Sequence, residues 1–314
     1  MTSSDTAVLI LGEDAREYAR LIAAAERSIP VTTCRSADAA RAAYNNQSIL
    51  FGNPASIADV LPGMPTIKWV QSTWAGVTPL LELDRRDYLL TGVKGVFGPQ
   101  MSEFVIGYML ANELKIIERF AAQRDRQWFR DESGTLLGKK IGIMGTGSIG
   151  QAIARRANEN GMTVTGLSRT GASNPDFEKV YGVENLGGFL RGLDYLVSVL
   201  PHTSATDTLL DRSALAQLPG HAYFINVGRS NVVDDEALMS ALANGELAGA
   251  VLDVFDVEPV PQDSPLWAAP NLLITAHIAA ISHPELIAPI FLDNYRRFVS
   301  GQDLVNVISF DNGY

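Results

Sequence analysis

The sequence is short of the two residue types that most often bind transition metals or form crosslinks. Cys34 is the single cysteine among 314 residues, so no disulfide can form within the chain. A lone thiol also fits a reducing compartment. The four histidines have no metal-ligand spacing, and no cysteine cluster accompanies them; they are His202, His221, His277 and His283. We therefore expect no metal site.

Long apolar runs and an excess of positive charge are also lacking. The first six residues carry no basic group, and the apolar stretch Ala7–Leu11 is too short for a signal peptide or a spanning helix. We expect a cytoplasmic protein with no membrane partner. The net charge of -10 argues against a nucleic-acid surface, which needs clustered lysine and arginine. A small anionic ligand stays open, because one local arginine can hold a carboxylate.

The sequence does contain enough apolar residues for two domains. They make up 46% of the 314 residues, which is sufficient for two ordinary cores. The first hundred residues alternate between strand-like and helix-like patterns, as parallel βα units do. We expect strands at Ala7–Leu11, Ile49–Phe51, Ile67–Ser72 and Tyr88–Thr91, and helices at Ala15–Arg27 and Ser36–Asn46.

The alternation resumes after a long helix candidate, Pro99–Phe120, and a polar stretch over residues 123–138. Further strands are expected at Met162–Leu167, Asp194–Leu200, Ala222–Val227, Ala248–Val254 and Leu272–Thr275, and a last helix, Pro284–Ser300, is expected to return to the N-terminal domain. The predicted fold class is α/β, with two doubly wound parallel-sheet domains and a cleft between them. A Rossmann cofactor domain over residues 103–284 would be inserted in a flavodoxin-like substrate domain over residues 1–102 and 285–314.

A glycine motif lies near the middle of the chain, between an apolar run and a helical pattern. It consists of Gly145, Gly147 and Gly150, with Ser148 and Ile149 between the last two glycines. Such a motif on its own also fits a tight turn with close helix–strand packing. Because a strand precedes it and a helix follows it, the motif predicts dinucleotide binding, with the pyrophosphate held by backbone N–H groups at the helix N-terminus.

The choice of dinucleotide depends on the end of the next strand, about 20 residues further on, where an NAD site carries an acid. Here the chain has Ser168, Arg169 and Thr170. Hydrogen-bonding groups and a positive charge suit a 2′-phosphate, so we predict NADP(H) as the preferred cofactor. A solvated loop arginine is the alternative interpretation, and NAD(H) stays open. The loops after later strands add Leu200, Pro201 and Val227 to the expected cofactor contacts.

Three later loops supply an arginine, a glutamate and a histidine. Each follows an expected strand, and the residues are Arg229, Glu258 and His277. Reduction of a 2-keto acid needs this set. Arginine fixes a carboxylate, histidine gives a proton to the developing alkoxide as hydride arrives, and glutamate orients the imidazole.

These motifs resemble the D-isomer-specific 2-hydroxyacid dehydrogenase family over nearly the whole chain, and most closely its glyoxylate/hydroxypyruvate reductase A-like branch. The resemblance to the family rests on the glycine turn, on Asn-Val-Gly-Arg ending at Arg229, on Glu258 before a proline, and on Thr-Ala-His around His277. The resemblance to the branch rests on Ser168-Arg169-Thr170, on Phe51-Gly52-Asn53-Pro54 and on the polar stretch before the glycine strand. It implies a homodimer built on the cofactor domains, and it implies that Asp253 holds the nicotinamide carboxamide. It also implies that backbone amides of one loop hold the substrate carboxylate; this loop reads Trp74, Ala75, Gly76, Val77.

The chain departs from the family pattern at two positions. Ala276 stands where a proline usually precedes the catalytic histidine, so the loop around His277 would be positioned less rigidly. Trp74 replaces a small or apolar residue. Its ring would either reshape the substrate pocket or pack against the hinge.

The predicted function is NADPH-dependent reduction of a small 2-keto acid, such as glyoxylate or hydroxypyruvate, to the D-2-hydroxy acid. His277 would donate the proton, with Glu258 and Arg229 in the roles given above. One alternative is a dinucleotide-sensing, corepressor-like interaction protein, although such a sensor has less need of the complete Arg–Glu–His set. Another alternative is a phosphoglycerate dehydrogenase-like enzyme.

Overall fold

The structure of the protein is a computed structural model, and it describes residues 6–310. The chain forms two compact units. One contains the described residues up to Val96 and from Ser282 onward, and the other contains Phe97–Ile281. Each unit is an α/β structure built on one parallel sheet, as the sequence predicts. Among the described residues, no helix combines the length and the apolar character needed to cross a membrane.

The first unit has a sheet of five parallel strands in the order β2-β1-β3-β4-β5, which is the flavodoxin-like order. Its strands are β1 Val8–Leu11, β2 Val31–Cys34, β3 Ile49–Gly52, β4 Trp69–Ser72 and β5 Leu89–Thr91. Its helices are α1 Ala15–Ala25, α2 Ala37–Ala43, α3 Pro54–Val60, α4 Thr78–Leu81 and α11 Pro284–Ser300, with a short 3₁₀ helix at Leu61–Gly63.

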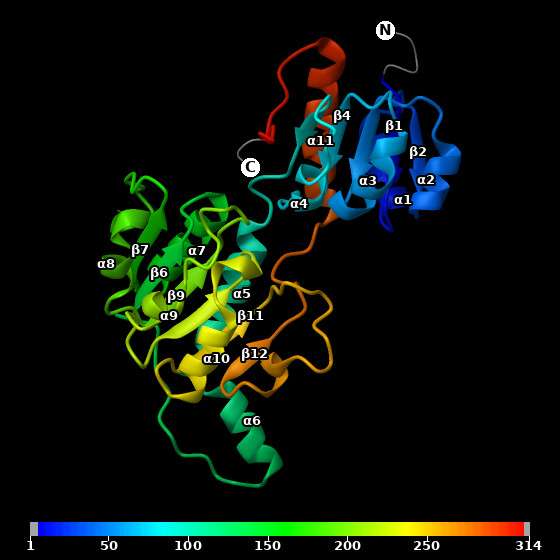
Figure 1. Ribbon diagram of the computed structural model, residues 1–314. Coiled ribbons are helices and arrows are strands. Elements are labelled where there is room, and N and C mark those ends of the chain that lie inside the picture. The colour runs from blue at the N-terminus through cyan, green and yellow to red at the C-terminus, as the bar shows by residue number, and fades with distance from the viewer. Residues whose placement is uncertain (1–5, 311–314) are drawn as a thin grey trace. The chain divides into compact units, whose positions relative to one another are not determined.

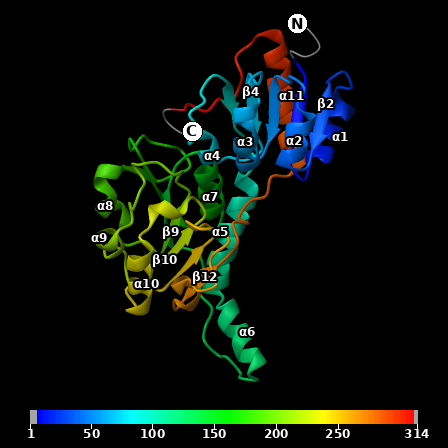
Figure 2. The same cartoon turned by 45° about the vertical axis from the view of Figure 1, so that its right-hand side comes forward.

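The helix α11 belongs to this unit although it follows all of the second unit in the chain. Figures 1 and 2 both draw it, in orange-red, beside the blue and cyan elements of the N-terminal segment. Its Phe291 is fully buried and stacks on Phe51 of β3, with 4.6 Å between the ring centroids, and on Trp69 of β4, at 5.3 Å. The apolar face of the returning helix therefore completes the core of the first unit.

The second unit has a sheet of seven parallel strands in the order β12-β11-β10-β9-β6-β7-β8. Its strands are β6 Lys140–Met144, β7 Thr163–Ser168, β8 Lys179–Gly182, β9 Tyr195–Ser198, β10 Tyr223–Asn226, β11 Gly249–Leu252 and β12 Leu272–Ile274. Its helices are α5 Gly98–Glu113, α6 Ile116–Arg124, α7 Ser148–Glu159, α8 Leu186–Leu190, α9 Arg212–Leu215 and α10 Asp235–Ala243, with 3₁₀ helices at Val183–Asn185, Ser230–Val232 and Pro265–Ala268.

The strand order of the second unit is that of a doubly wound nucleotide-binding fold. The chain runs outward from β6 to β7 and β8, then returns to pair β9 with the other side of β6. The order of the strands therefore reverses beside β6, at the point where the glycine motif begins. Ligands of doubly wound sheets bind at such a switch point, outside the carboxyl ends of the strands.

The helix predicted over residues 99–120 is wrong as a single element, because the chain forms two helices there. Lys115 adopts a left-handed conformation, with φ of 50°, and its N–H bonds to Asn112 rather than continuing the α-helical pattern. The helix α6 and the segment that returns from it, residues 114–138, form what we call the α6 arm. Both views show α6 extending away from the sheet of its own unit (Figures 1 and 2).

Two strands, β2 and β8, carry no clear signal in the sequence. Both lie at an edge of their sheet, where a strand has a neighbour on one side only. Their sequences, Val-Thr-Thr-Cys and Lys-Val-Tyr-Gly, are correspondingly mixed, and most of their residues are partly exposed. The central strands β1 and β3 are fully buried and read as continuous apolar runs, which is why they could be predicted.

Candidate functional site

Each of the three glycines of the motif has a different physical role. Gly145 has a φ of +105°, which a residue with a side chain rarely adopts. A Cβ atom at Gly150 would lie 1.9 Å from the carbonyl oxygen of Gly145, so the helix approaches the turn as closely as glycine allows. A Cβ atom at Gly147 would meet nothing within 4 Å. The open side at Gly147 fits a pyrophosphate approaching the N-terminus of α7, a helix of 12 residues.

The residues predicted to select the cofactor follow the glycine turn in the neighbouring strand. Ser168 is the last residue of β7, and its hydroxyl accepts a hydrogen bond from the N–H of Gly171 at 3.1 Å. Arg169 and Thr170 are exposed at the start of the loop. Further along this loop, the Asn174 amide donates to the carbonyl oxygen of Thr146 in the glycine turn, at 3.4 Å. The loop after β7 is therefore tied to the turn that precedes α7.

The loops after β9 and β10 are in direct contact. A Cβ atom at Gly228 would lie 2.7 Å from the backbone nitrogen and oxygen of Leu200, which precedes Pro201. Val227 is buried, with 4% of its surface exposed. The predicted cofactor contacts Leu200, Pro201 and Val227 thus lie on two loops that only a glycine allows to pack this closely.

Arg229 lies on a loop that a buried asparagine holds. The side chain of Asn226, at the end of β10, donates to the carbonyl oxygen of Arg229 at 3.0 Å and accepts from the N–H of Gly228 at 3.1 Å. Burial lowers the pKa of the Arg229 guanidinium, and the negative charge of Glu258 opposes that effect. Arginine remains charged under such shifts, so the loop presents a permanent cation.

His277 and Glu258 form the closest pair of predicted catalytic groups. The Nδ1 atom of His277 lies 2.8 Å from Oε2 of Glu258, and each side chain is 37% exposed. The other carboxylate oxygen of Glu258 accepts a hydrogen bond from the N–H of Phe255 at 3.0 Å. Glu258 is therefore fixed at one oxygen and positions the imidazole with the other. Glu258 contacts His277, and its negative charge also acts on Arg229, so the three predicted groups lie near one another in the second unit.

Asp253 follows β11 and is buried, with 1% of its surface exposed. Its carboxylate accepts hydrogen bonds from Thr275, Ile278 and Ala279, which flank His277. The contact to a nicotinamide carboxamide that the family resemblance implies stays a prediction.

The loop predicted to hold the substrate carboxylate lies in the first unit, after β4. The Ser72 hydroxyl donates to the carbonyl oxygen of Trp74 at 2.8 Å and accepts from its N–H at 2.9 Å. The Ser282 hydroxyl donates to the carbonyl oxygen of Thr73 at 2.7 Å. Val77 is buried while the Trp74 side chain is 45% exposed. The backbone of this loop is therefore held by two serines.

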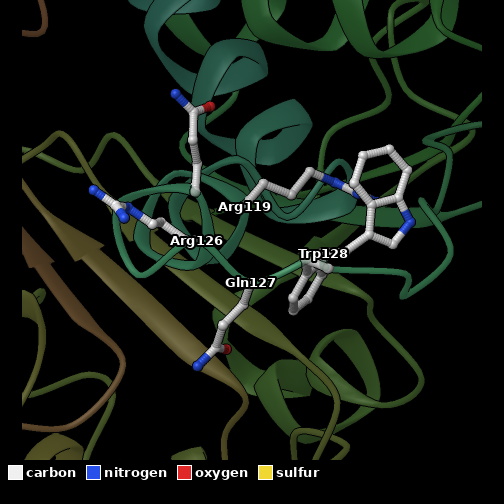
Figure 3. A pocket seen from close by; sticks show the side chains of 6 residues that line it. Arg119, Arg126, Gln127 and Trp128 are labelled. Carbon is white, nitrogen blue, oxygen red and sulfur yellow. The ribbon is translucent and has the colours of Figure 1, made fainter.

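A separate hollow of about 530 Å³ lies on the α6 arm and contains none of the predicted site residues. Figure 3 shows Arg119, Arg126, Gln127 and Trp128 around it. Elsewhere among residues 6–310, no group of histidine, cysteine, aspartate and glutamate side chains is arranged to hold a metal ion.

Comparison with known proteins decides the family. A sequence family described as "D-isomer specific 2-hydroxyacid dehydrogenase, NAD binding domain" matches residues 106–279. The chain belongs to this family. Both the predicted family and the predicted enzyme class are therefore confirmed: the protein is an oxidoreductase with a domain for a nicotinamide cofactor.

Individual relatives agree with this assignment over most of their length. Glyoxylate/hydroxypyruvate reductase A of Yersinia enterocolitica is 32% identical over 264 residues, which cover 82% of this chain and 84% of the relative. A solved structure of a family protein from Aeromonas salmonicida is 40% identical, covers 98% of this chain and 100% of its own, and gives a TM-score of 0.93. An NADPH-dependent glyoxylate/hydroxypyruvate reductase from Sinorhizobium meliloti, solved with NADP and sulfate, is 28% identical with coverages of 98% and 100% and a TM-score of 0.87.

Sequence reasoning missed the residues that hold these loops. Asn226 and Thr275 stand inside the Asn-Val-Gly-Arg and Thr-Ala-His motifs, and Ser72 ends an expected strand, but the sequence assigns no loop-holding role to any of them or to Ser282. The available signal was a polar residue at the end of an otherwise apolar strand, since such a residue is buried and needs partners. The identity of those partners could not be read from the sequence, because Ser282 contacts a loop more than 200 residues away in the chain.

Two alanine substitutions separate the structural and ligand-facing roles of the glycine turn. Gly150→Ala introduces a Cβ atom 1.9 Å from a backbone oxygen, so we expect a loss of about 1–3 kcal/mol or more in the free energy of unfolding. Gly147→Ala meets no protein atom, so its melting temperature should stay near that of the wild type while NAD(P)H affinity falls. Thermal melts and fluorescence titrations with NADPH and NADH measure both quantities. A stable Gly147→Ala protein with unchanged affinity for both cofactors contradicts the predicted pyrophosphate site.

Proposed function

We propose that the protein reduces a small 2-keto acid, such as glyoxylate or hydroxypyruvate, to the D-2-hydroxy acid, with NADPH as the preferred reductant. The observation that carries this proposal is the 2.8 Å contact between His277 and Glu258, beside the charge of Arg229. All three residues follow strands of one parallel sheet, and they lie in the unit that contains the glycine turn. A positioned proton donor beside a cation for the carboxylate suits keto-acid reduction.

His277 holds and transfers the proton in this proposal. Because Nδ1 faces Glu258, the proton to be transferred sits on Nε2. It passes to the substrate carbonyl oxygen as negative charge develops there, and the reaction consumes one proton for each keto group reduced. The contact with the Glu258 carboxylate keeps the imidazole ring in one orientation.

The substrate carboxylate would be bound by two kinds of donor. Arg229 offers its guanidinium, whose fork of N–H groups matches a carboxylate. The backbone amides of Trp74, Ala75, Gly76 and Val77 in the first unit would contribute neutral donors. We therefore propose that residues 97–281 form the cofactor-binding domain and that the other unit is the substrate-binding domain.

Bound NADPH would supply the hydride that reaches C2 of the substrate. The amides at Gly147 and Ser148 would hold its pyrophosphate, and Ser168, Arg169 and Thr170 would bind the 2′-phosphate. The NADPH-dependent reductase from Sinorhizobium meliloti, solved with NADP, supports the choice of NADP(H) over NAD(H).

Replacing His277 with alanine tests the proposed proton donor. General acid catalysis contributes about 100- to 10,000-fold, so we expect kcat for glyoxylate or hydroxypyruvate reduction to fall by at least about a hundredfold. NADPH affinity, measured by fluorescence titration, should stay close to the wild-type value. His221→Ala is the control, because His221 pairs with Asp194 at the opposite end of the strands, and it should keep wild-type kcat. Near-normal turnover in the His277 variant would refute the assignment.

Replacing Arg169 with alanine tests the cofactor preference. A hydrogen bond to a charged group contributes about 1.5–3 kcal/mol, so kcat/KM with NADPH should fall by about 10- to 100-fold. The value with NADH should change little, because NADH has no 2′-phosphate. The exposed Arg191, on a different loop, gives the matched control Arg191→Ala. A wild-type enzyme that prefers NADH would show that Arg169 does not select NADPH by binding its 2′-phosphate.

We further propose that the protein is a homodimer assembled through the unit that binds the cofactor. The α6 arm supports this, because it exposes several large apolar side chains, including Phe120 at 69% and Trp128 at 88%. Such a patch on a single protein marks an interaction surface. Light scattering after size exclusion should give the mass of two chains for the wild type and of one chain for Phe120→Glu with Trp128→Ser. Leu286→Glu in the other unit is the control, and a monomeric wild type contradicts the proposal.

A further inference from the structure

The loop that carries His277 is held by a buried acid from a different loop. We propose that Asp253 is a positioning residue for His277: its carboxylate fixes the backbone of residues 275–279 in the conformation that presents the imidazole. The proposal deepens the proposed function, since it rests on His277 being the proton donor. It differs from a role in which Asp253 chiefly contacts the cofactor.

The hydrogen bonds of Asp253 reach the loop on both sides of the histidine. One carboxylate oxygen accepts from the Thr275 hydroxyl at 2.5 Å and from the N–H of Ile278 at 2.9 Å, and the other accepts from the N–H of Ala279 at 2.9 Å. The N–H of His277 itself bonds to the backbone oxygen of Asp253 at 2.8 Å. Four bonds from one residue therefore fix five consecutive residues.

The burial of Asp253 makes these bonds obligatory. Only 1% of the residue is exposed, and a buried carboxylate is costly unless donors surround it. No lysine, arginine or histidine within residues 6–310 forms a salt bridge with it, so the loop donors are what stabilise its charge. Of the roughly four acceptor positions of a carboxylate, three are engaged by the loop.

The backbone of His277 explains why the loop needs such support. His277 has a φ of +54°, in the left-handed region, where a residue with a side chain pays a conformational cost. Such a conformation persists only when the surroundings over-determine it. Asp253 is itself anchored, because its N–H bonds to the backbone oxygen of Asn226 at 3.0 Å. The sheet thus sets the position of Asp253, and Asp253 sets the position of the histidine.

Amide hydrogen exchange of the protein without cofactor tests the contact directly. Asp253→Asn keeps the shape of the side chain but turns one acceptor into a donor that faces an N–H group. Exchange at Ile278 and Ala279 should accelerate about tenfold or more, since each loses or weakens a bond to a charged acceptor. The matched control is Asp256→Asn, which makes the same chemical change at an exposed residue three positions further on and should leave exchange unchanged.

The catalytic consequence is a split between turnover and cofactor affinity. A displacement of about 1 Å at a catalytic group costs on the order of a hundredfold, so kcat of Asp253→Asn should fall by about that factor. The Kd for NADPH should change by a smaller factor than kcat, although the same carboxylate is also the predicted contact of the nicotinamide carboxamide. Thr275→Val removes a single donor and serves if the first variant does not fold; it should give smaller changes in the same directions.

Two results overturn the proposal. One is unchanged amide exchange at Ile278 and Ala279 in a folded Asp253→Asn protein. If Asp253→Asn does not fold, unchanged exchange in Thr275→Val overturns the proposal in the same way. The other is accelerated exchange with undiminished kcat. A large loss of NADPH affinity with unchanged exchange would assign Asp253 to the cofactor instead. Failure of the proposed function looks different, because active His277→Ala would remove the proton-donor role while leaving the exchange result in place.

Discussion

The parallel direction of the seven strands in the second unit is the constraint on which its chemistry depends. Every carboxyl end lies at one edge of the sheet, so the loops after β6, β10, β11 and β12 emerge together. The glycine turn, Arg229, Glu258 and His277 occupy those loops in that order. Residues more than a hundred positions apart in the chain are brought near one another without any special connection, and an antiparallel sheet would send half of them to the opposite edge.

Buried polar groups at the strand ends fix the conformations of the loops that emerge at this edge. Asn226 holds the loop of Arg229, Asp253 holds the loop of His277, and in the other unit Ser72 holds the backbone of Trp74. Each costs desolvation, which its hydrogen bonds to loop donors and acceptors offset. An apolar residue at the same position would avoid this desolvation cost, but it would make no hydrogen bonds to the loop. The loop beyond it would then depend on its own conformational preferences, which are weak in segments of this length.

The sequence predicts the two sheets and the site loops, but it misses two edge strands, one helix break and the contacts between distant segments. Continuous apolar strands and the glycine motif indicate two doubly wound sheets, because burial on both faces leaves a plain compositional signal. The edge strands β2 and β8 escape prediction since half-exposed strands lack it. The break at Lys115 escapes prediction because the surrounding residues favour helix and no glycine or proline marks the position where the helix ends. The bond from Ser282 to Thr73 joins distant segments, which no local pattern can encode.

The two departures from the family pattern are easier to understand once these contacts are known. Ser72 bonds to the N–H and carbonyl oxygen of Trp74, so the loop backbone is held independently of which side chain stands at residue 74. The conformation of the amides is therefore compatible with a tryptophan. At Ala276, a proline would stiffen the loop through its fixed φ. Here the residues on either side are bonded to Asp253, so hydrogen bonds supply the rigidity that the missing ring would have given.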